Sequence, residues 1–115
     1  MNGLNFTKNL KKAALLSAMT LAPLSAYCGT VNGTVTGIQL SPNSTVAWVG
    51  YTGTRTGTPT CAGSTVYFAF DIGALNGKSL YAYLLAAMHA NKTIVISGTN
   101  DCSVTQGYEA IAFVL

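Results

Sequence analysis

Charged side chains are scarce in this chain of 115 residues, which has six basic residues, three acidic residues and one histidine. Nucleic-acid binding and attachment to anionic membranes both need clustered Lys and Arg. A metal centre needs several His, Cys or carboxylate ligands, and the glycine-rich phosphate motifs GxGxxG and GxxxxGK[ST] do not occur. We therefore expect no nucleic acid, no metal and no cofactor as partners.

Catalytic patterns are equally scarce. His89 is the single histidine, and pairing it on paper with Asp71 or Asp101 as a Ser–His–Asp triad has no weight, because a triad is defined by geometry. At the end of a helix, His89 is expected to meet the helix dipole or solvent. Asp71 and Glu109 could form an acid–base pair, but we interpret both as solvated charges at strand ends. We predict no catalytic residue and no enzyme activity.

No apolar run is long enough to span a membrane, which takes about 20 residues. The run that exists, residues 13–26, is uncharged and is broken by Pro23. It follows a segment whose only charges are Lys8, Lys11 and Lys12. A basic start, a short apolar core and a small-residue exit are the parts of a secretory signal. The sequence thus predicts export to the periplasm or the exterior, with no membrane insertion after the signal is removed.

The cleavage site is predicted after Ala26, which makes residues 1–26 the signal peptide and residues 27–115 a single mature domain. Leu24 is larger than the peptidase favours, so a cut two or three residues later stays open. Cys28 could suggest a lipid anchor, but Tyr27 stands where that signal requires a small residue.

Removal of the signal changes the charge of the chain. Three of the six basic residues leave with it, and the mature part keeps three cations and three anions: Arg55, Lys78, Lys92, Asp71, Asp101 and Glu109. The mature domain is formally neutral, so its partners should be recognised by short-range contacts and not by a charge field.

Three cysteines remain, and an exported chain of this size often needs a disulfide. Cys28 lies beside the new N-terminus and is the natural unpaired thiol. We predict a Cys61–Cys102 bond, which would close a loop of about 40 residues and contribute on the order of 4 kcal/mol in the chain-entropy model.

Thr, Gly and alternating apolar residues favour strands through most of the mature chain. Strands are predicted at 30–40, 45–51, 66–72, 93–99 and 109–115. In the first, the apolar phase switches at Gly37, which indicates a bulge. In the second, Trp48 shares a face with Val46 and is assigned to the core. Residues 52–65 lack periodicity and are predicted to form a loop that is mobile apart from Cys61.

One helix is predicted, over residues 77–92. Leu80, Leu84, Ala87 and Met88 recur at helical spacing and form an apolar stripe. Asn91 suits a left-handed helix stop.

The element order β-β-β-α-β-β, with a bent first strand, is that of the OB-fold, a five-stranded barrel. In that fold the third and fifth strands run parallel and side by side. Cys61 and Cys102 each precede one of these strands, so the predicted disulfide agrees with the fold. The alternative is an open α+β sheet with the helix on one face.

The segment KSLYAYLLAAMHANKTIVISGTNDC, residues 78–102, resembles the helix–strand–cysteine region of small secreted bacterial proteins of uncharacterised function. It is also distantly similar to the binding subunits of AB5 toxins, especially the subtilase-cytotoxin type. The resemblance implies a disulfide-stapled OB-fold, assembly into a homo-oligomeric ring and binding of cell-surface glycans. No sugar-contacting residue of those subunits can be matched to a position in this sequence.

Aromatic residues are the best lead to a ligand, since sugar rings stack on aromatic faces. Tyr67 should face outward from its strand, and Tyr83 lies off the apolar stripe of the helix. Arg55, the one arginine of the mature chain, could hold a ligand carboxylate such as that of a sialic acid, or be solvated. The predicted function is a non-enzymatic module that binds a glycan or a protein surface. The alternative is a periplasmic inhibitor or envelope structural protein that acts on a partner protein.

Overall fold

The computed structural model describes residues 28–115, so the predicted signal peptide lies outside the described residues. Five strands and one helix follow in the predicted order: β1 Thr30–Leu40, β2 Val46–Tyr51, β3 Tyr67–Asp71, α2 Gly77–His89, β4 Thr93–Gly98 and β5 Ile111–Val114. Over residues 28–115 the fold is β-rich, with one antiparallel sheet, one helix and one disulfide.

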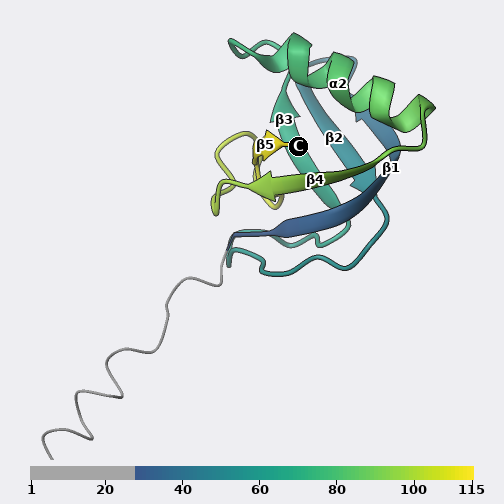
Figure 1. The fold of residues 1–115 in the computed structure, drawn as a ribbon. Coiled ribbons are helices and arrows are strands. Elements are labelled where there is room, and N and C mark those ends of the chain that lie inside the picture. The colour runs from purple at the N-terminus through teal and green to yellow at the C-terminus, as the bar shows by residue number, and fades with distance from the viewer. Residues whose placement is uncertain (1–27) are drawn as a thin grey trace, which may run out of the picture.

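The sheet has the strand order β3-β2-β1-β4-β5, and every neighbouring pair is antiparallel. β1 is the long central strand: its first half pairs with β4 and its second half with β2. The register shifts between Val35 and Gly37, which confirms the predicted bulge. A bulge increases the local twist of a strand, and Figure 1 shows the sheet strongly curved, with α2 lying across one end of it.

The starts of β3 and β5 meet, as predicted. Isolated parallel bridges join Ala62 to Gly107 and Ala69 to Ala110. Cys61 and Cys102, which precede these two strands, form the predicted disulfide, with Cα atoms 6.1 Å apart. The contact between β3 and β5 stays limited to isolated bridges, so the sheet itself is not closed.

The core lies between the curved sheet and the helix. Its buried members are Val31, Val35, Ala47, Val49, Phe68, Phe70, Leu84, Ala87, Ile94 and Ile96. The helix ends as predicted: Asn91 has a φ of 51°, the left-handed conformation that stops a helix. Leu84 and Ala87 belong to this core, so the apolar stripe of the helix faces the inner side of the sheet.

The assignment of Trp48 to the core is wrong. Trp48 lies on the face of β2 opposite Ala47 and Val49, is half-buried outside the core, and packs edge-on against Tyr108 with ring centroids 6.0 Å apart. In β5, Phe113 is 52% exposed. A register shift in the β4–β5 pair, between Ser97 and Gly98, interrupts the regular alternation of side chains there.

We predict that Leu84→Ala destabilises the domain by about 2–5 kcal/mol, because Leu84 is fully buried in the core. Each kcal/mol corresponds to a fall in Tm of about 4–8 °C at this size. Leu75→Ala is the matched control, since Leu75 is 99% exposed. Equal thermal denaturation midpoints for the two variants would contradict the packing of α2 described above.

Candidate functional site: a groove between α2 and β5

A groove of about 470 Å³ lies between the later residues of β3 and β5 and the first turns of α2. The two strands are joined at Ala69 and Ala110, and the lining begins just after these residues, at Phe70 and Ile111. The groove is therefore the space left where the sheet does not close.

The lining combines aromatic and polar side chains. Phe70 comes from β3, Tyr83 from α2 and Phe113 from β5. Asn76 and Ser79 lie at the start of the helix and supply neutral hydrogen-bonding groups. Aromatic faces with a few convergent polar groups, in a volume of this size, are typical of small-ligand sites.

Asp71 is the one charged residue in the lining of the groove. Hydrogen bonds from the Thr45 side chain and from the Gly73 backbone N–H, which lies 2.9 Å from Oδ1, hold the pKa of this carboxyl below its usual 3.8. The carboxylate is thus ionised at neutral pH and accepts hydrogen bonds only, so it would select a donor on a ligand.

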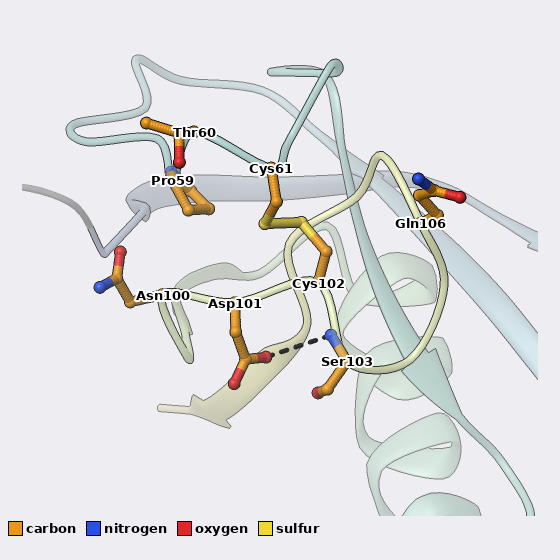
Figure 2. Close-up of a pocket in the computed structure, with 8 residues that line it drawn as sticks. All are labelled: Pro59, Thr60, Cys61, Asn100, Asp101, Cys102, Ser103 and Gln106. Carbon is orange, nitrogen blue, oxygen red and sulfur yellow. Dashed lines mark hydrogen bonds between the residues drawn. A yellow bond between two sulfur atoms is a disulfide. The ribbon is translucent and has the colours of Figure 1, made fainter.

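A second hollow, of about 710 Å³, lies beside the disulfide and has no aromatic residue in its lining. Figure 2 shows Pro59 and Thr60 on one loop and Asn100–Ser103 on the other, joined by the Cys61–Cys102 bond. Asp101 is already engaged: its Oδ1 accepts from the Thr99 hydroxyl at 2.8 Å and from the Ser103 N–H at 3.2 Å. Because its lining has no aromatic side chain, this hollow is the weaker candidate.

Glu109, two residues before the start of β5, forms a buried ion pair with Arg55. Glu109 is 0% exposed, and its Oε1 lies 3.0 Å from Nη2 of Arg55, whose side chain is 4% exposed. The guanidinium carbon lies 4.0 Å from the centre of the Phe68 ring, a cation–π contact. The Gly29 backbone N–H donates to both carboxylate oxygens, at 2.7 and 2.9 Å. Paired and hydrogen-bonded in this way, the two charges can occupy the interior.

The sequence candidates do not form one site. Tyr83 lies in the groove. Tyr67 lines neither hollow; its ring covers Gly50, where a Cβ would come within 3.2 Å of it. Arg55 is bound to Glu109 and donates through Nη1 to the Tyr51 hydroxyl and the Tyr67 carbonyl.

Two expectations about polar residues are wrong as a result. Glu109 is not a solvated charge but a buried one. The loop 52–65 is anchored in its middle, because Arg55 is held by Glu109, and Thr56 exchanges backbone hydrogen bonds of 2.9 Å with Thr30. Sequence reasoning also missed Phe70 and Phe113 as groove residues, since nothing in the alternation pattern shows where a sheet stays open.

Over residues 28–115, no three His, Cys, Asp or Glu side chains lie close enough to hold a metal ion. Within the same range no helix is long and apolar enough to cross a membrane. Comparison with known proteins finds no matching family model, no matching characterised sequence and no matching solved structure.

We predict that Arg55→Met destabilises the domain by about 3–5 kcal/mol, because it leaves the Glu109 carboxylate buried without its cation. The double variant Arg55→Met/Glu109→Leu removes both charges and should recover much of that loss. Urea denaturation of the two variants measures the difference, with Lys78→Met on the exposed surface as control. A single variant as stable as the control would show that the pair is not buried.

We predict that Asp101 titrates below 3.8, since hydrogen bonds from Thr99 first and Ser103 second lower its pKa. A carboxyl whose pKa falls on folding stabilises the fold above its unfolded pKa, and this contribution is lost as pH falls through the folded value. NMR titration of the Ser103 amide should therefore show a midpoint below pH 3.8. A midpoint at or above that value would mean that these hydrogen bonds do not form.

Proposed function

We propose that this chain is an exported, non-enzymatic binding module, and that its ligand is a neutral saccharide held in the groove between α2 and β5. The observation that carries the proposal is the lining of the groove, to which Tyr83 and Phe113 contribute aromatic rings and Asp71 an ionised carboxylate. An apolar sugar face stacks on aromatic rings, and sugar hydroxyls donate to a carboxylate.

The proposal extends to the fold and its assembly. The parallel bridges between β3 and β5, together with a helix between β3 and β4, support an OB-fold-like barrel that is open at the groove. The toxin binding subunits that residues 78–102 resemble form rings, and we propose a homo-oligomer of the same kind. Light scattering tests this: a strict monomer would favour the alternative below.

The alternative function is an inhibitor or envelope protein that binds a partner protein. Leu75, 99% exposed, and Phe113, 52% exposed, favour it, because large exposed apolar side chains are common at protein interfaces. Leu75→Ser separates the two functions. This substitution lies outside the lining of the groove and should leave saccharide binding intact while weakening a protein complex.

We predict that Asp71→Asn weakens saccharide binding by about tenfold or more, because it removes an ionised acceptor. Tyr83→Phe should weaken binding by about two- to tenfold through loss of one hydroxyl. Tyr67→Phe is the matched control, since Tyr67 lies outside the groove. The measurement is a glycan array followed by calorimetry on the best ligand. Equal losses for Tyr67→Phe and Tyr83→Phe, or no glycan bound, would refute the site.

We also predict that this affinity is nearly independent of salt, because the mature chain is neutral and the contacts are short-range. Raising ionic strength from 0.1 M to 1 M shortens the Debye length from about 10 Å to about 3 Å. Titrations at both concentrations should give similar Kd values. A tenfold loss of affinity would reveal a charged contact with the ligand.

A further inference from the structure

The backbone nitrogen of Gly29 lies where a cation would pair with the Glu109 carboxylate. It lies 2.7 Å from one oxygen of the buried Glu109 carboxylate and 2.9 Å from the other. An amide at this position has one hydrogen, which the two oxygens must share as a three-centre bond. An ammonium has three hydrogens and could give each oxygen its own. The geometry around Glu109 therefore fits a terminal amine at least as well as an amide.

The surroundings of Gly29 leave no room for a side chain. A Cβ at this residue would come within 2.5 Å of Arg55 Nε and 2.7 Å of Glu109 Oε1. The residue is also fixed on its other side, because its carbonyl accepts from the Gly98 N–H at 2.8 Å. Cys28, directly before it, is exposed and has a free thiol. Among the described residues, Gly29 is thus held in the interior through both its N–H and its carbonyl, whereas Cys28 lies outside it.

We propose that export processing cuts the Cys28–Gly29 bond, and that the new α-amino group of Gly29 becomes a second cation of the buried Glu109 site. A signal peptidase hydrolyses this amide with one water: Cys28 keeps the new carboxyl group with the leader, and the released Gly29 amine takes up a proton. The proposal rests on the export proposed above.

The residues before the Cys28–Gly29 bond match what a signal peptidase requires. A signal peptidase reads small residues at the first and third positions before the cut, and for this bond they are Cys28 and Ala26. A cut after Ala26 would instead place the larger Leu24 at the third position. Processing after Cys28 also removes the unpaired thiol, and the mature chain then keeps only the bonded pair Cys61–Cys102.

Intact mass and N-terminal sequencing test the proposal directly. The full chain is expressed with its own leader in an exporting bacterial host, and the product is recovered without reductant. We expect a chain that starts at Gly29, holds one disulfide and takes up no maleimide. An exported chain that starts at Tyr27 and carries a reactive thiol, or one that starts at a lipid-modified Cys28, would overturn the inference but not export. An uncut precursor in the cytoplasm would overturn both.

Matched substitutions locate the cut. Cys28→Trp places a large side chain directly before the proposed bond and should abolish cleavage there. Leu24→Trp blocks only the site after Ala26 and should leave the product unchanged. The opposite pattern, with Leu24→Trp blocking maturation and Cys28→Trp tolerated, would refute the proposed site.

A thermodynamic cycle tests the role of the new amine. The natural exported product is compared with the same product after selective acetylation of its α-amino group, which returns the nitrogen to an amide. We expect the free amine to raise Tm by about 4 °C or more, and Glu109→Gln to remove most of that difference. A difference that persists in Glu109→Gln, or no difference in the natural sequence, would show that the amine does not act on this carboxylate.

Discussion

The buried carboxylate of Glu109 is the constraint on which the rest of this structure depends. The carboxylate accepts a hydrogen bond from Gly29, in the segment before β1, and forms an ion pair with Arg55, in the loop after β2. The backbone at Gly98 packs against it so closely that a Cβ there would come within 2.0 Å of Oε2. Removing a partner from a buried charge is costly, since the charge then has neither water nor a counter-ion. Segments far apart in the sequence are therefore held together at one point.

The contacts that join β3 to β5 and the groove that we propose as the binding site lie at opposite ends of these two strands. The starts of β3 and β5 are joined by the disulfide and the parallel bridges, and the ion pair ties Glu109, just before β5, to Arg55 in the loop that precedes β3. Beyond Ala69 and Ala110 no such contact follows, and the groove occupies the space between the strands. A ligand site can remain open there because the strands are already fixed at their other end, so the groove does not have to be closed for the fold to be stable.

Local pattern was sufficient to predict the elements and the bulge in β1, because alternation and helical spacing are local properties. The pairing of Cys61 with Cys102 was predicted from the position of Cys28 and from the expected order of the strands. The environment of Glu109 could not be predicted. A glutamate at the end of a polar loop has the same local sequence whether it is solvated or buried, and its partner Arg55 lies 54 residues away. The prediction that Trp48 is a core residue was wrong for a related reason: alternation assigns residues to two faces of β2 but does not say which face is buried in the core. Tyr83, selected because it lies off the helical stripe, does line the groove, because such a residue lies at the edge of the packed face.

The charges that remain after the buried pair is formed decide which ligands the groove can accept. Arg55, the residue that sequence alone offered to a ligand carboxylate, is already bound to Glu109 inside the protein. Asp71 is the one charge in the lining of the groove, and its pKa is lowered, so it is anionic at neutral pH. An acidic sugar would bring a second anion close to it without a cation from the lining to compensate. Electrostatics therefore disfavours a sialic acid, which the sequence left open as a ligand for Arg55, and agrees with the proposed neutral ligand, whose hydroxyl groups can donate to Asp71.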